Sequence, residues 1–329
     1  MKTIALLAVT TALLAQQPTV DNAKLETRAF LGTLATQLTH LGAGPYWAAY
    51  SEPIIAGQHG DMCSWNRNGN DDSGRTPGTP LRLEGEIALV ILIRVENSQP
   101  REFRVTSPDC HLDAGGLPFY FLTGVPASES LAWLKTQVGG THSEAAVMAI
   151  SLHQGAAADQ ALDDFTATTN PVEVRKRAAF WLGNSRGTHG VATLKHMLAT
   201  DPSADVRDRV VFALSQSKDP AGIPLVIEAA RSDKDAHIRG QALFWLAQRA
   251  ASQISKDAIK NAVDTDPDSA VRERAVFSLS QMRNGEGIPM LIDLAKTHRD
   301  PAVRKKAMFW LGQSKDPRAV EFFAQVLKP

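Results

Sequence analysis

Cysteine and net charge are both scarce in this chain of 329 residues. It has two cysteines, and its 35 lysines and arginines equal its 35 aspartates and glutamates in number. Proteins that bind nucleic acids usually carry a strong basic surplus on one face. We therefore do not expect nucleic acid as the partner.

Long apolar runs are also missing. The run from Ile4 to Ala15 follows Met1 and Lys2 and precedes two glutamines, and it is short for a bilayer span. A charged start, an apolar centre and a small residue are typical of a signal peptide. We expect residues 1–16 to be such a peptide. The mature protein is then exported, to the periplasm or outside the cell, with no stable membrane anchor; a retained anchor is the alternative.

Motifs of several enzyme classes are absent. The chain has no His-Glu-x-x-His zinc helix and no phosphate-binding Walker loop. We assign no catalytic, cofactor-binding or metal-binding residue, and we expect no cofactor.

The second half of the chain, by contrast, repeats itself. The block Val174–Leu182 returns four times with the same order of an aliphatic residue, arginine, small residues, phenylalanine and leucine. The arginine of each copy follows the previous one after 32 or 33 residues, at Arg175, Arg207, Arg239, Arg272 and Arg304. A period of this size is typical of solenoids built from stacked helix pairs.

Each copy predicts two helices. In the first, Val174, Ala178 and Leu182 form one apolar stripe at helical spacing. Asp-Pro or Asn-Pro dipeptides precede the helices, because the acid or amide caps free backbone N–H groups and proline suits the first turn. They are Asn170-Pro171, Asp201-Pro202, Asp266-Pro267 and Asp300-Pro301 before first helices, and Asp219-Pro220 and Asp316-Pro317 before second helices.

This pattern resembles the HEAT repeat, in the short form called PBS-lyase HEAT-like. Five copies are clear, and a weaker stretch from Glu144 to Asn170 lacks the Val-Arg pair and is expected to cap the array. The resemblance implies an α-α superhelix of about six helix pairs over residues 141–329 that binds other macromolecules. Deoxyhypusine hydroxylase resembles this architecture and holds two irons with His-Glu pairs, but none of the nine histidines here precedes a glutamate.

Residues 17–140 have a different character. The stretch Ile87 to Val95 predicts a buried strand, residues 102–105 alternate, and residues 24–42 predict a helix. Together they predict a small α+β domain with a mainly antiparallel sheet. The chain is therefore expected to be mainly α, with this domain before the solenoid.

The two cysteines, Cys63 and Cys110, lie in this first domain, and in an exported protein they predict one disulfide. A zinc site that adds His59 and His111 is the alternative, although the spacing matches no zinc motif well. The polar stretch 66–74 weakly resembles a calcium loop, but it lacks the glutamate expected near position twelve.

The repeated arginines predict a ladder between repeats. We expect each to reach the aspartate or the carbonyls of the preceding turn, since a guanidinium bridges two acceptors. Aspartates recur at what looks like the matching place, namely Asp201, Asp233, Asp266 and Asp300. A row that binds phosphate or acids is the alternative.

One phenylalanine also recurs in every copy, away from the apolar stripe. Two interpretations stay open: the rings fill seams between first helices, or they form an exposed row that docks a partner. The set is Phe180, Phe212, Phe244, Phe277 and Phe309, with Trp181, Trp245 and Trp310 beside it in alternate copies. We expect an exported, non-catalytic scaffold that binds a protein partner through the solenoid. The alternative is an enzyme with its site in the first domain and the solenoid as a substrate-docking arm.

Overall fold

The computed structural model describes residues 17–57, 63, 88–249 and 252–327. The expected signal peptide, His59 and the polar stretch 66–74 lie outside these residues. The chain divides into two compact units, residues 1–161 and 162–329, whereas the sequence placed the domain boundary between residues 140 and 141. Among the described residues, no helix is both long and apolar enough to cross a membrane.

The first unit is a mixed sheet with helices. Its five-stranded sheet has the order β2-β7-β3-β4-β5, and a small parallel pair, β1 with β6, lies apart from it. The strands are β1 (Thr19–Asp21), β2 (Leu25–Ala29), β3 (Tyr46–Pro53), β4 (Ala88–Glu96), β5 (Gln99–Thr106), β6 (His111–Asp113) and β7 (Phe119–Thr123). The helices are α1 (Leu34–Leu38), α2 (Ala127–Gln137) and α3 (Ser143–Leu152), followed by α4 (Ala156–Thr166), which crosses the division between the units.

The pairing of the central sheet is mostly antiparallel, as the sequence predicted. The longest strands, β3, β4 and β5, pair antiparallel, while β7 pairs parallel with both β2 and β3. The hairpin between β4 and β5 turns at Asn97 and Ser98, which both have positive φ, at 53° and 56°. Such paired positive φ values match the right-handed twist of the flanking strands.

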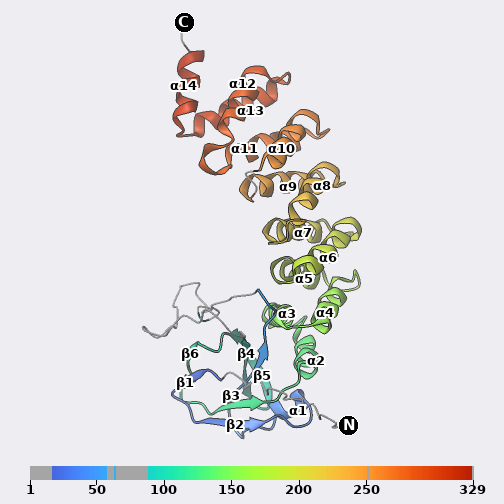
Figure 1. Cartoon of the computed structure of the whole chain (residues 1–329), viewed down its shortest axis with the longest axis vertical. Helices are drawn as coiled ribbons and strands as arrows, with labels where there is room; N and C mark the ends of the chain where they lie inside the picture. Colours follow the sequence, from blue (N-terminus) through green and yellow to red (C-terminus); the bar gives the residue numbers. More distant parts are fainter. Residues whose placement is uncertain (1–16, 58–62, 64–87, 250–251, 328–329) are drawn as a thin grey trace, which may run out of the picture. The chain divides into compact units, whose positions relative to one another are not determined.

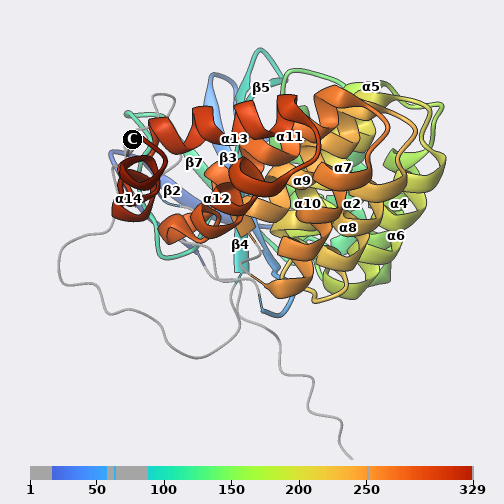
Figure 2. The same cartoon turned by 90° about the horizontal axis from the view of Figure 1, so that it is seen from above.

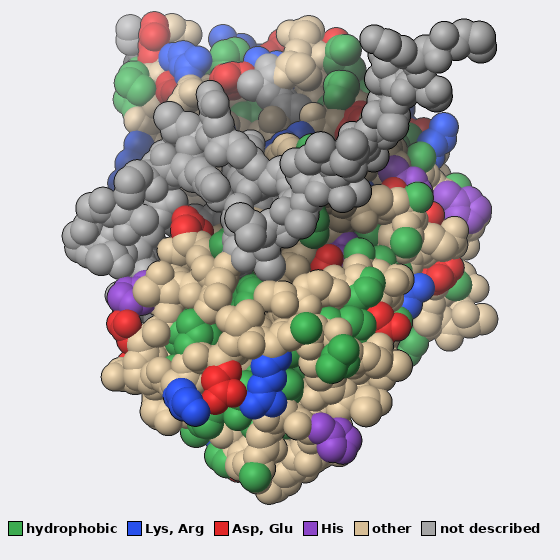
Figure 3. All heavy atoms as spheres, turned by 60° about the horizontal axis from the view of Figure 1, so that its bottom comes forward, with side chains coloured by type: hydrophobic (Ala, Val, Ile, Leu, Met, Phe, Trp, Pro, Cys, Tyr) green, Lys and Arg blue, Asp and Glu red, His purple; other side chains and the backbone are tan. Residues whose placement is uncertain are grey.

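Both faces of the sheet are covered. On one face Tyr50 bonds to α2 and Phe103 packs against Trp133 of α2. On the other, Val90, Phe119 and Phe121 form a core to which β1 and β6 contribute. Figure 3 shows one face of this unit, on which hydrophobic and charged side chains of the described residues are scattered. That face therefore does not single out a docking patch.

The helix predicted over residues 24–42 is wrong. The structure has strand β2 at its start and the short helix α1 near its end. Gly32, with φ 73°, prevents a continuous helix between them, and the side chain of Thr33 caps α1 by accepting from the Thr36 N–H. The sequence pattern missed this because leucines at helical spacing happened to continue across the glycine.

The second unit is a stack of helix pairs (Figure 1). The first helices are α5 (Val172–Ser185), α7 (Ala204–Gln216), α9 (Ala236–Arg249), α11 (Ser269–Ser280) and α13 (Pro301–Gln313). The second helices are α6 (Gly187–Thr200), α8 (Gly222–Ser232), α10 (Gln253–Thr265), α12 (Ile288–Thr297) and α14 (Pro317–Val326). Figure 2 looks along the stack and shows α5, α7, α11 and α13 toward one side, with α6, α8, α10 and α12 toward the other.

The predicted apolar stripe is the core of this unit. Val174, Ala178 and Leu182 are at most 5% exposed, and the other copies bury the same positions. Neighbouring first helices approach closely: a Cβ at Gly183 would meet the Ala213 carbonyl oxygen at 2.7 Å. Each repeat therefore depends on the next for its packing, as expected for a solenoid.

Candidate functional site

The phenylalanine row forms a continuous aromatic stack along the first helices. Phe180 stacks on Phe212 and Phe244 on Phe277, each with ring centroids 6.1 Å apart and nearly parallel planes. Tryptophans join these pairs: Trp245 contacts Phe212 at 4.7 Å, and Trp310 contacts Phe277 at 4.8 Å. The stack thus crosses every seam between the five first helices.

The same rings keep part of their surface in solvent. Phe180, Phe212, Phe244 and Phe277 are half-buried, and Phe309 at the end of the row is 53% exposed. These rings both pack between neighbouring first helices and keep part of their surface exposed. The packing interpretation therefore describes one side of each ring, and the docking interpretation describes the other.

Two arginines lie over the stack, and the sequence analysis missed them. Arg209 lies over Phe180 and Phe212, at 5.9 and 5.5 Å from the ring centroids, and Arg274 lies over Phe244 and Phe277, at 5.1 and 4.8 Å. Cations within about 6 Å of a ring face are attracted to it. Their signal in the sequence is an arginine three residues before the phenylalanine, which the first copy also has, at Arg177, beside its tryptophan.

The ladder arginines are placed differently. Arg175, Arg207 and Arg239 each donate from Nε and Nη2 to both carboxylate oxygens of one aspartate, at 2.8 to 3.2 Å. The partners are Asp201, Asp233 and Asp266, which lie 26 or 27 residues further along the chain. The carboxylate therefore comes from the following loop rather than the preceding turn.

The preceding turn contributes carbonyls instead. Nη1 of Arg207 donates to the Asp201 carbonyl oxygen at 3.1 Å, and Nη1 of Arg239 to that of Asp233 at 3.0 Å. Each guanidinium thus connects three consecutive segments. Burial by itself would raise the pKa of Asp266, but the hydrogen bonds from Arg239 and from the Asp268 N–H, together with the nearby guanidinium charges, outweigh it and hold that pKa below its usual range.

The ladder changes at its fourth link. His298 occupies the place that Asp201, Asp233 and Asp266 hold in the other copies, and its Nδ1 accepts the Asp300 N–H at 3.0 Å. Arg272 is left with backbone carbonyls and a distant contact of 3.7 Å to Asp300. The sequence analysis counted Asp300 as the matching aspartate, but Asp300 caps α13. The last arginine, Arg304, donates to the His298 and Arg299 carbonyl oxygens.

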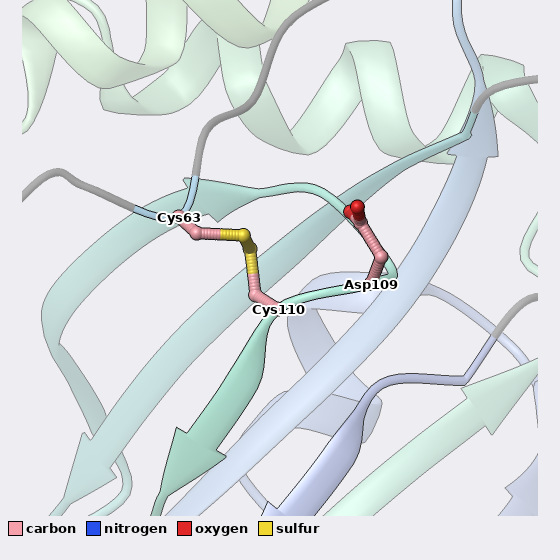
Figure 4. Close-up of side chains that lie close together, drawn as sticks. All are labelled: Cys63, Asp109 and Cys110. Atoms are coloured by element: carbon pink, nitrogen blue, oxygen red, sulfur yellow. A yellow bond between two sulfur atoms is a disulfide. The ribbon is translucent and has the colours of Figure 1, made fainter. Parts of the chain in front are cut away.

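The predicted disulfide is present. Cys63 and Cys110 are bonded and span a sequence separation of 47 residues (Figure 4). Closing a loop of this length stabilises a fold by roughly 3–4 kcal/mol in the chain-entropy model. The Asp109 carboxylate lies near the sulfurs, but bonded sulfurs are not thiolate ligands. His111 contacts Asp21 instead, at 2.7 Å.

A chain of polar side chains lies inside the first unit. Tyr50 bonds to Ser130 at 3.0 Å, and Ser130 bonds to His153 Nε2 at 2.8 Å. All three residues are at most 1% exposed, so this chain joins β3, α2 and the end of α3 without reaching solvent. Beside it on β3, Glu52 is 3% exposed and its Oε1 has no partner among the described residues. Burial raises the pKa of Glu52 to about 8.

One catalytic-looking pattern was not assigned from the sequence. Residues 183–187 read Gly-Asn-Ser-Arg-Gly, which fits the Gly-x-Ser-x-Gly pattern of hydrolases. A nucleophile elbow needs a strand-to-helix turn with an exposed serine. Here the segment joins α5 to α6, and Ser185 is 5% exposed and donates to the Trp181 carbonyl oxygen. The serine is therefore part of the helix packing.

The comparisons with known proteins concern the second unit. The family model for HEAT repeats matches residues 160–247 and 257–329. No curated protein matches the sequence significantly.

Similar solved structures include two enzymes. The CpcE–CpcF complex of phycocyanin lyase from Nostoc is 19% identical, over 48% of this chain and 99% of that one, with a TM-score of 0.33. Human deoxyhypusine hydroxylase is 18% identical, over 63% of this chain and 80% of that one, with a TM-score of 0.27. Likenesses this weak transfer neither an activity nor a partner. The family match and the stacked helix pairs agree, and the protein belongs to the HEAT-repeat family through its C-terminal half.

Proposed function

We propose that this protein is an exported, non-catalytic scaffold that binds a protein partner through the aromatic row of its HEAT repeats. The observation that carries the proposal is the partly exposed stack, which runs over five first helices without interruption. Exposed aromatic side chains held rigidly by their neighbours are typical of protein-binding hot spots. Stacked repeats provide the extended surface on which such a row lies.

Two features support export. The first is the N-terminal sequence, with its charged start and short apolar run. The second is the disulfide of the first unit, because disulfides persist in oxidising compartments and are rare in the cytosol. Fractionation of native cells checks the compartment, and N-terminal sequencing of the purified protein locates the cleavage.

A paired substitution tests the row. Phe212 and Phe277 are replaced together by serine, and tagged wild type and variant are used to capture partners from the native exported fraction. Because the rings are half-buried, we expect a loss of about 1–2 kcal/mol per ring, below the cost of a fully buried phenylalanine. We also expect most of the captured partner to be lost at a temperature where both proteins are folded.

The matched control is Val320→Ser, which removes an exposed apolar side chain from α14, away from the row. It should leave capture unchanged. If the folded double variant captures the same partner as the wild type, the row is a packing device and the proposal fails.

A further inference from the structure

The two arginines over the aromatic stack differ from the ladder arginines in what their N–H groups contact. Among the described residues, the Arg209 guanidinium has no hydrogen-bond acceptor and no ion pair. Arg274 has one such partner, since its Nη2 donates to Gln241 Oε1 at 3.2 Å. By contrast, Arg175, Arg207 and Arg239 of the ladder each hold a carboxylate with two N–H groups.

The aromatic rings fix these guanidinium groups in place. Each lies over two stacked rings, Phe180 and Phe212 for Arg209, and Phe244 and Phe277 for Arg274. The absence of a side chain at Gly240 leaves space for the side chain of Arg274, because a Cβ at Gly240 would meet Arg274 Cγ at 3.1 Å. A planar guanidinium held by its face leaves its N–H edges free, and these edges match a carboxylate in bidentate geometry.

The nearby acids do not use these edges. Glu173 pairs with Lys176 at 2.9 Å, and Glu273 pairs with Lys306 at 2.8 Å. Asp208, next to Arg209, has a buried Oδ1 without a partner among the described residues. The row therefore presents two preorganised cationic groups, set between aromatic rings, whose carboxylate positions are open.

We propose that the segment which docks on the aromatic row is an acidic peptide, with one carboxylate for Arg209, one for Arg274 and apolar side chains between them. This inference rests on the proposed function and names the chemistry of its partner. Charge complementarity argues for it, and the fork geometry favours carboxylates. A nucleic acid fits less well, because the chain as a whole has no basic surplus.

The spacing of the two arginines defines the peptide. They lie on α7 and α11, two first helices apart, and neighbouring packed helices are about 8–10 Å apart. The carboxylates should thus be separated by roughly 16–20 Å, which an extended chain spans in five or six residues. Residues an even number apart share one face of an extended chain, so two glutamates six positions apart meet both arginines.

The test uses a fluorescent peptide of this design, with two glutamates six positions apart and leucines at the two same-face positions between them. Binding to the full chain is followed by fluorescence anisotropy at low salt. Three further peptides replace both glutamates by glutamine, lysine or phosphoserine. We expect the glutamate peptide to bind best and its affinity to fall as salt is added.

The protein variants are Arg209→Gln with Arg274→Gln, and the same pair changed to lysine. Loss of both charged hydrogen-bonding groups should weaken binding of the glutamate peptide about tenfold or more. The lysine pair keeps the positive charges without the bidentate guanidinium geometry. Its affinity for the glutamate peptide should lie between those of the glutamine pair and the wild type. Arg231→Gln, on the exposed end of α8, is the matched control and should bind like the wild type.

Several outcomes overturn the inference. These are equal binding of the glutamine peptide, no binding of the glutamate peptide, binding of the phosphoserine peptide alone, or an unchanged affinity in the glutamine pair. Native capture separates this failure from failure of the proposed function. If Phe212→Ser with Phe277→Ser abolishes capture and the arginine pair does not, the row binds a partner that is not acidic, and only the present inference falls.

Discussion

The two units handle buried polar groups in different ways. In the second unit, each of the first three ladder arginines meets a buried aspartate, as with Arg207 and Asp233, whose side chains are 4% and 5% exposed. In the first unit, Glu52 is buried, its Oε1 has no partner among the residues that the structure describes, and burial raises its pKa to about 8. The repeated architecture reuses one paired solution at its first three links, while the sheet holds Glu52 with an oxygen that has no partner among the described residues. Asp208 is the exception in the second unit, since its Oδ1 is also buried without such a partner. Buried ion pairs therefore connect neighbouring repeats in the second unit, whereas burial disfavours the ionised form of Glu52 in the first unit.

The strongest way to break this comparison is Arg207→Ala. The substitution leaves Asp233 buried without its bidentate donor, and removal of one partner of a buried pair costs roughly 3–5 kcal/mol. Arg272→Ala is the control within the same chain. The Arg272 side chain is 25% exposed, and the carboxylate of Asp300 is 3.7 Å away, too far for a close ion pair. That change should cost about 0–1 kcal/mol. Urea denaturation followed by circular dichroism measures both, and equal shifts would show that the buried links carry no special weight.

Glu52→Gln addresses the first unit through pH. The folded pKa of about 8 exceeds the ordinary value of 4.5, so between these pH values the folded protein holds a proton that the unfolded chain has released. This contribution to stability is full below about pH 4.5 and is lost as pH rises through 8. At about 1.4 kcal/mol per pKa unit, the wild type should lose a few kcal/mol between pH 5 and pH 9.

The glutamine variant cannot ionise, so its stability should change less over this range and exceed that of the wild type at pH 9. Thermal unfolding at several pH values measures the difference. Glu102→Gln, on the exposed edge of β5 and bonded to Arg104, is the control and should keep the wild-type pH dependence. A glutamine variant with the wild-type pH profile would mean that Glu52 is already ionised in the fold.

The smallest expected effect sharpens the comparison inside the ladder. His298→Asp places a carboxylate where Asp266 receives Arg239 in the previous link, and it should give Arg272 a bidentate partner. We expect a net gain of at most about 1 kcal/mol at neutral pH, because the change also removes the contact of His298 Nε2 with Asp264 Oδ1 at 3.3 Å. His298→Asn keeps an acceptor for the Asp300 N–H without the charge and should give no gain. The two variants, each with and without Arg272→Ala, form a double-mutant cycle, and a coupling near zero would contradict the expected pairing.

The two units also differ in how much of their structure could be predicted from the sequence. The second unit contains five copies of its own pattern, so comparison of the chain with itself showed the stripe, the arginines and the phenylalanines. It did not show which loop supplies the carboxylate. A helix turns about 100° per residue, so Arg175 points away from Val174, but only the hydrogen bonds to Asp201 show that it faces the following repeat. Asp300 lies four residues before Arg304, whereas the position that matches Asp201, Asp233 and Asp266 lies six residues before it and holds His298.

The first unit offered no such internal comparison. The bond between Tyr50 and Ser130 joins residues 80 apart, and that between Ser130 and His153 joins residues 23 apart. No local period marks such contacts, because they depend on how strands and helices pack. The strand Ala88–Glu96 was predictable from its β-branched apolar run, whereas β2 was hidden in a stretch that also fits a helix. Arg209 and Arg274 were missed for another reason: their role appears only in every second copy.

That alternation has a consequence for how the array can change in length. From α7 to α13 the backbone repeats with each helix pair, but the surface repeats with every two, since Arg209 and Arg274 alternate with Trp245 and Trp310 along the stack. Helix α5 carries both Trp181 and an arginine, Arg177, at the matching place. Duplication or deletion of one pair would bring two tryptophan-bearing or two arginine-bearing helices side by side and interrupt the order. Duplication or deletion of two pairs would preserve it. If this surface is under selection, lengthened or shortened descendants of the chain should differ from it by even numbers of helix pairs.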